Sequence, residues 1–124
     1  MTVAKIFWVA LGGALGSVMR AAVSYWIPTE FPWATILVNV VGSFVIGLVL
    51  ALADSGSDFH LTIKLFIVIG FCGAFTTFST FSYQTVMLLS QGKYGQAFLN
   101  IILSLVLALF ALWLGIRSIG VFSI

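Results

Sequence analysis

Neutral hydrogen-bonding side chains inside apolar segments are the residues of this sequence best suited to chemistry. Asn39 lies within the apolar run 33–53, and Thr35 precedes it by four residues, on the same face of a helix. A primary amide carries up to four hydrogen-bonding sites, and all of them need partners in an apolar environment. Two interpretations stay open: an amide that joins two helices, or an NH2 donor directed at an anion.

A second cluster combines phenylalanine rings with polar side chains. Phe78 and Phe81 are three residues apart, and Thr77, Thr80 and Gln84 form a polar line on a neighbouring face. The edge of an aromatic ring is positive and can face an anion. Ordinary packing is the alternative for the rings, because the chain has 12 phenylalanines. Ser104 and Asn100, in the last apolar run, either add further donors or join helices.

Charged and metal-binding groups are few. There is one histidine and one cysteine, and the three acidic residues, Glu30, Asp54 and Asp58, fall in expected loops. This set does not support hydrolysis, metal catalysis or redox chemistry, so we do not expect an enzyme. Because no carboxylate lies inside a span, the neutral donors suit an anion. Arg20, near the end of the first run, either attracts anions to a vestibule or anchors the helix at the headgroups.

The composition identifies the environment of these residues. Of the 124 residues, 62% are hydrophobic and 6% are charged, whereas a soluble domain has about 25% charged residues. Five basic residues are too few for a nucleic-acid surface, so no nucleic-acid partner is expected. Apolar runs near 4–26, 33–53, 61–90 and 97–120 reach the roughly 20 residues that cross a lipid bilayer. We predict an all-α integral membrane protein of one domain, residues 1–124, with about four transmembrane helices.

The third run is longer than one span needs, and hydroxylated or β-branched residues are clustered in its middle, from Thr76 to Ser82. Such residues compete for backbone hydrogen bonds and weaken a helix. Gly70 and Gly73, just upstream, favour an interruption. We predict a non-helical break in the middle of this span, facing protein or water.

The basic residues are almost evenly divided between the two sides of the membrane. The side with the N-terminus would hold Lys5, Lys64 and Arg117, and the other side would hold Arg20 and Lys93. A difference of one basic residue hardly orients a chain. The sequence is therefore compatible with insertion in both directions, and hence with an antiparallel homodimer.

Pairs of small residues at a spacing of four occur in three of the predicted spans. They are Gly12 with Gly16, Ser43 with Gly47, and Ala111 with Gly115. Such pairs allow helix backbones to approach closely, but they are common in membrane helices. Whether they mark an interface stays open.

Three segments, taken together and in order, resemble a known family. They are Gly13-Ala14-Leu15-Gly16 with Arg20, the ten residues from Thr35 to Phe44, and the thirteen from Gly70 to Ser82. They closely resemble the Fluc/CrcB fluoride channels, and the resemblance covers nearly the whole chain. It implies a dual-topology, antiparallel homodimer with two fluoride pores along the subunit interface. Such a channel exports fluoride passively across the inner or plasma membrane of a bacterial cell and relieves fluoride toxicity.

The resemblance also implies roles for individual residues. Asn39 is implied as the amide donor of the pore, and Phe78 and Phe81 as the rings whose edges contact fluoride. The other positions that match the pore lining are Thr35, Thr80 and Ser104. At the break, the backbone carbonyls of Gly73 and Thr76, from both subunits, are implied to hold a structural sodium ion.

One residue departs from the family pattern, and the sequence leaves two other functions open. Gln84 stands where many relatives have glutamate; its amide can still donate to an anion. A small multidrug-resistance-type, proton-coupled exporter also has four short spans, but that mechanism needs a carboxylate within the membrane. A non-transporting assembly subunit is the third possibility.

Overall fold

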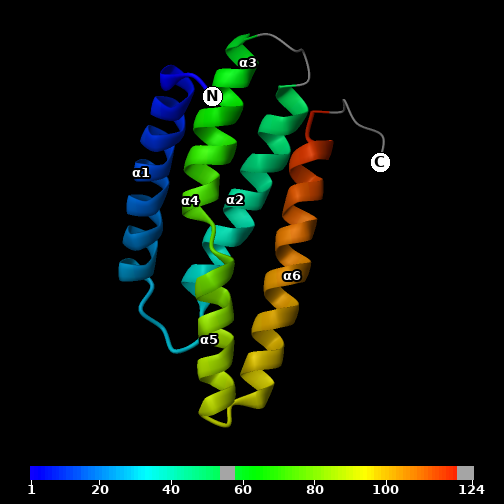
Figure 1. Ribbon diagram of the computed structural model, residues 1–124. Coiled ribbons are helices and arrows are strands. Elements are labelled where there is room, and N and C mark those ends of the chain that lie inside the picture. Colours follow the sequence, from blue (N-terminus) through cyan, green and yellow to red (C-terminus); the bar gives the residue numbers. More distant parts are fainter. Residues whose placement is uncertain (54–57, 120–124) are drawn as a thin grey trace.

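The computed structural model describes residues 1–53 and 58–119, which contain helices and no strand (Figure 1). The elements follow one another as α1 Val3–Trp26, α2 Trp33–Leu52, α3 Asp58–Ile63, η1 Lys64–Cys72, α4 Gly73–Phe75, α5 Phe78–Ser90 and α6 Tyr94–Arg117. Asp58, expected in a loop, starts α3, while Asp54 lies outside the described residues.

Four helical stretches in the described part are long and apolar enough to cross a membrane. They are α1, α2, the composite Leu61–Ser90 and α6, with 24, 20, 30 and 24 residues. At 1.5 Å of rise per residue, each spans roughly 30 Å or more. The prediction of an all-helical protein with four spans is confirmed, and the protein is a multi-pass membrane protein.

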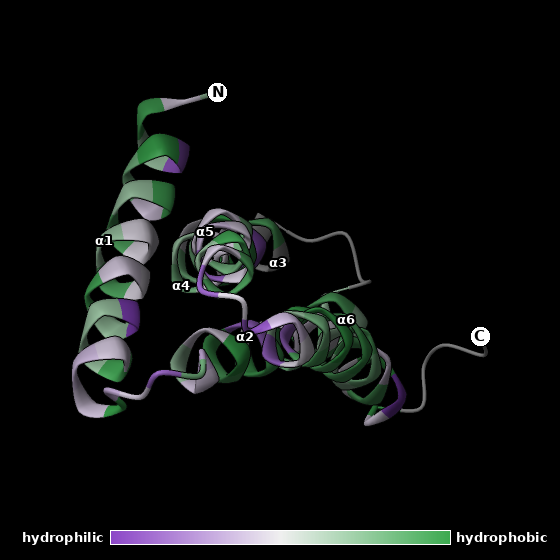
Figure 2. Cartoon of the chain, turned by 90° about the horizontal axis from the view of Figure 1, so that it is seen from below, coloured by the Kyte–Doolittle hydropathy of each residue, from purple (hydrophilic) through white to green (hydrophobic). Residues whose placement is uncertain are grey.

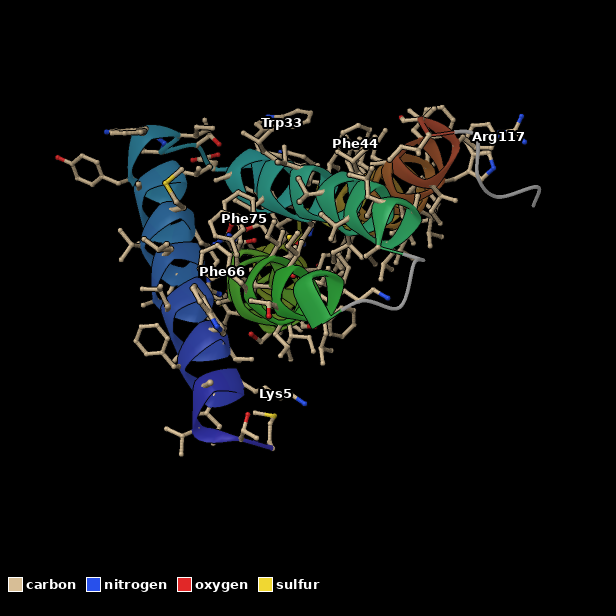
Figure 3. All side chains as sticks on the ribbon, turned by 90° about the horizontal axis from the view of Figure 1, so that it is seen from above. Lys5, Trp33, Phe44, Phe66, Phe75 and Arg117 are labelled. Atoms are coloured by element: carbon tan, nitrogen blue, oxygen red, sulfur yellow. The ribbon has the colours of Figure 1, made fainter. Side chains whose placement is uncertain are left out.

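The spans run alternately up and down, so that α1 begins at the end of the bundle where α6 finishes (Figure 1). α1 packs against η1 and α4, α2 packs mainly against α6, and α5 contacts α6. Seen along the bundle, hydrophobic residues occur along every span and predominate in α6 (Figure 2). Trp33 and Phe44 project outward from α2, whereas Phe66 and Phe75 lie between the third span and its neighbours (Figure 3).

Glycines allow two close helix contacts within the chain. A Cβ at Gly12 or Gly16 would clash with the backbone of η1, at the Phe66 and Phe71 carbonyls respectively. Gly47 of α2 and Gly115 of α6 likewise face each other's backbone. Small residues of the predicted pairs therefore mark contacts between helices of one chain, α1 with η1 and α2 with α6.

The third span is interrupted where the sequence predicted a break. Thr76 (φ −80°, ψ 158°) and Thr77 (φ −155°, ψ 114°) are extended, between α4 and α5. Gly70 has a different role from the expected one: it is buried in η1, and a Cβ there would lie 2.8 Å from the Val9 carbonyl oxygen of α1. The nine-residue π-helix η1 was not predicted, because the wider turn leaves no distinctive sequence pattern.

Candidate functional site

Asn39 of α2 forms two hydrogen bonds with the break of the third span. Its Nδ2 donates to the Thr77 carbonyl oxygen (3.2 Å), and the Thr77 N–H donates to its Oδ1 (2.7 Å). The amide thus pairs with both polar groups of one extended residue, as a neighbouring β-strand would. An NH2 group has two hydrogens, so one remains for a further acceptor. Both interpretations of Asn39 are therefore compatible with the geometry.

Thr77 lies at the centre of this site, although the sequence predicted it only as part of a polar line with Thr80 and Gln84, without a pore role. It is the N-cap of α5: the Thr80 N–H donates to its Oγ1 (3.1 Å), and this Oγ1 donates to Thr80 Oγ1 (3.0 Å). A threonine side chain that satisfies a free N–H of the first turn stabilises a helix start. The available signal was a threonine at the point where the helix was expected to resume.

At the break, two backbone carbonyls lack the N–H donors that they would have in a continuous helix. In a continuous α-helix, the N–H groups of Thr77 and Thr80 would donate four residues back, to Gly73 and Thr76. Here they donate to Asn39 Oδ1 and Thr77 Oγ1 instead. Gly73 and Thr76 are the two residues whose carbonyls were predicted to hold sodium. Carbonyl oxygens are suitable ligands for a hard cation, so the residues present fit such an ion.

A cavity of about 270 Å³ adjoins the break, and we call it the phenyl pocket. Its walls come from α2, α5, α6 and the break, and no charged residue lines it: Asn39, Ser43, Ile46, Thr76, Thr77, Phe78, Phe81, Ser104, Leu105, Ala108 and Leu109. The rings of Phe78 and Phe81 lie 5.4 Å apart at 43°. Phe81 is buried, whereas Phe78 is 74% exposed, so this wall is open on the outside of the chain.

A second cavity, of about 230 Å³, is called here the arginine pocket. It lies between α1, α2 and the start of α5, and is lined by Ser17, Arg20, Ala21, Ser24, Thr35, Val38, Thr77 and Thr80. Thr77 lines both cavities. The polar positions predicted for one pore are therefore divided: Thr35 and Thr80 accompany Arg20, not the phenyl rings.

Gln84 lines neither of these two cavities. Its Oε1 is buried and has no hydrogen-bond partner. An orphaned buried oxygen carries a free-energy penalty that calls for a partner. The structure shows no such partner, and a role for Gln84 in the pore stays a prediction.

Comparisons with known proteins identify the family of this chain. Residues 7–116 match the family model described as CrcB-like protein, Camphor Resistance (CrcB). The chain belongs to the CrcB family. A relative in Acidobacterium capsulatum is 46% identical over 90% of this chain and 92% of its own length. A relative in Campylobacter lari is 44% identical over 91% of this chain and 95% of its own length. A relative in Opitutus terrae is 46% identical over 94% of this chain and 94% of its own length.

Each of these three relatives bears the name fluoride-specific ion channel FluC. The matched region of this CrcB-family chain contains both cavities, from Ser17 to Leu109. The structure brings Asn39, Phe78, Phe81 and Ser104 to one cavity and places Arg20 in the other.

Proposed function

We propose that this protein is a fluoride-selective ion channel, not an enzyme, which exports fluoride passively and relieves fluoride toxicity. The observation that carries the proposal is the phenyl pocket, where an amide and two phenylalanine rings meet at a helix break. The names of the CrcB-family relatives support the same conclusion.

The chemistry of the phenyl pocket suits a small, strongly hydrated anion. Such an ion gives up its water only where several donors replace it. The remaining N–H of Asn39 and the positive edges of Phe78 and Phe81 are donors of this kind. None of them is charged, so the anion is held without being trapped. Arg20 attracts anions into the adjoining arginine pocket, which acts as the vestibule.

The working unit proposed is an antiparallel homodimer. Around the break, Gly73 and Phe78 are exposed in a single chain, whereas Phe75 and Thr77 are buried. Irregular backbone at membrane depth is tolerated only where protein or water covers it. A second copy packed against Gly73 and Phe78 covers the break and closes the phenyl pocket. The even division of basic residues allows the two copies to insert in opposite directions.

Sodium is the ion proposed for the carbonyls of Gly73 and Thr76 at the subunit interface. The support for this is local: the N–H groups that normally satisfy these carbonyls donate elsewhere. Two carbonyls from each copy would supply four oxygen ligands to one cation. When bound, the ion would supply a positive charge at the subunit interface. The bacterial inner or plasma membrane is the proposed location.

Fluoride efflux from liposomes tests the proposal. Purified protein is reconstituted, a potassium ionophore clamps the voltage, and chloride-loaded liposomes are measured in parallel. Fast loss of fluoride with retention of chloride is the expected result. If correctly inserted protein releases no fluoride, the proposal fails, and proton-coupled drug uptake then distinguishes an exporter from an assembly subunit.

A further inference from the structure

Asn100 lies outside both cavities and yet connects two residues of the phenyl pocket. Its side chain, on α6, is 0% exposed. Its Nδ2 donates to Thr85 Oγ1 of α5 (2.9 Å), and the Thr85 hydroxyl donates to the Phe81 carbonyl oxygen (2.8 Å). On the other side, the Ser104 hydroxyl donates to Asn100 Oδ1 (3.3 Å). The chain of hydrogen bonds thus runs from one pocket wall to the other.

The direction of these bonds matters for an anion. A serine hydroxyl has a single proton, and Ser104 directs it at Asn100, away from the phenyl pocket. The pocket therefore receives the lone pairs of Ser104, which repel an anion. At 3.3 Å this bond is longer than good O–H···O bonds, which measure about 2.5–3.0 Å. The proton is consequently held weakly.

Ser104 also differs from other hydroxyls of this chain. Several donate to the backbone carbonyl four residues earlier, at 2.7–2.9 Å: Thr76 to Cys72, Ser82 to Phe78, Thr85 to Phe81 and Ser118 to Leu114. This bond is the usual choice of a serine or threonine in a helix. Ser104 donates instead to the side chain of the residue four positions earlier, which is Asn100.

We propose that Asn100 is a positioning residue of the pore, acting through Ser104. Its Oδ1 keeps the Ser104 hydroxyl out of the strong backbone bond and holds the proton weakly, so that fluoride entering the phenyl pocket takes it over. Its Nδ2, through Thr85, keeps α5 and α6 in register while the hydroxyl turns. This inference rests on the proposed fluoride channel.

Replacement of Asn100 with leucine removes both of its hydrogen bonds, and comparison with Thr85→Val separates the two roles. In Asn100→Leu, the Ser104 hydroxyl turns to the backbone carbonyl of residue 100, and fluoride loses a donor. A hydrogen bond to a charged group accounts for about tenfold or more in affinity. We expect the half-saturating fluoride concentration of liposome efflux to rise about tenfold, as in Ser104→Ala. The double variant should be no worse than either single one, because both remove the same donor.

Two controls accompany these variants. Thr85→Val breaks the contact between the helices but leaves Ser104 next to Asn100, so thermal stability should fall while half-saturation stays near that of the wild type. Ser118→Ala removes the hydroxyl of the C-cap residue of α6, far from the phenyl pocket, and should change neither. Additive losses in the double variant, or an unchanged half-saturation in Asn100→Leu, would refute the role of Asn100. Absence of fluoride efflux from the wild type would instead refute the proposed function.

Discussion

Thr77 is the residue whose substitution tests the construction of the break most directly. Valine has nearly the same shape as threonine but no hydroxyl, so Thr77→Val removes the acceptor of the Thr80 N–H and leaves the backbone bonds to Asn39 possible. To regain a partner, the Thr80 N–H needs residue 77 to leave its extended conformation (φ −155°, ψ 114°) and become helical, which brings the Thr76 carbonyl within reach four residues back. That bond would occupy one of the oxygens proposed for sodium.

The structure gives the expected size of the effect. Loss of a threonine N-cap costs about 1 kcal/mol of stability, which lowers the melting temperature by on the order of 4 °C for a chain of this size. Sodium at the proposed site would add its own stabilisation, about 2.7 kcal/mol when sodium is at roughly 100 times its Kd. Thr77→Val should have a lower melting temperature in any buffer, because the cap is lost. It should also lose the increase in stability that sodium gives the wild type.

Thermal unfolding in detergent, measured in matched sodium and potassium buffers, tests both the loss of the cap and the loss of the sodium-dependent stabilisation. Thr77→Ser keeps the hydroxyl and serves as the matched control, with a sodium-dependent gain close to that of the wild type. If Thr77→Val retains the full sodium-dependent gain, the cap does not control the Thr76 carbonyl, and the argument from diverted donors is wrong. If the wild type shows no sodium-dependent gain, the proposed sodium site fails as well.

Further substitutions test three other parts of the structure. Phe78→Ile or Phe81→Ile removes a positive ring edge at similar volume, so fluoride efflux should fall about tenfold or more; efflux at the wild-type rate from folded protein would contradict the ring-edge contact. Gly47→Val forces a side chain into the backbone of α6, so size-exclusion chromatography should show aggregation, whereas Gly95→Ala, in open space, should elute normally. Arg20→Gln should slow fluoride entry several-fold at low ionic strength and much less at high salt, because screening removes the long-range attraction; equal slowing at both salt concentrations would assign Arg20 to direct contact.

The span architecture could be predicted from the sequence because it depends on local composition. Apolar runs of about 20 residues determine where helices cross the bilayer, whatever their neighbours are. The break was predictable for a similar reason: the hydroxyls from Thr76 to Ser82 compete for backbone bonds within one or two turns. Its extended residues are Thr76 and Thr77, at the start of that cluster.

The partners of the polar side chains were decided by tertiary structure. Asn39 and Thr77 are 38 residues apart, and only the packing of α2 beside the third span brings them to hydrogen-bonding distance. The division of Thr35 and Ser104 between two cavities likewise follows from the positions of α1 and α6. Spacing along a helix defines which residues share a face, but not what that face meets. Hydrophobicity acts on each segment separately, whereas a hydrogen bond requires two specific atoms within about 3 Å, and that requires the assembled bundle.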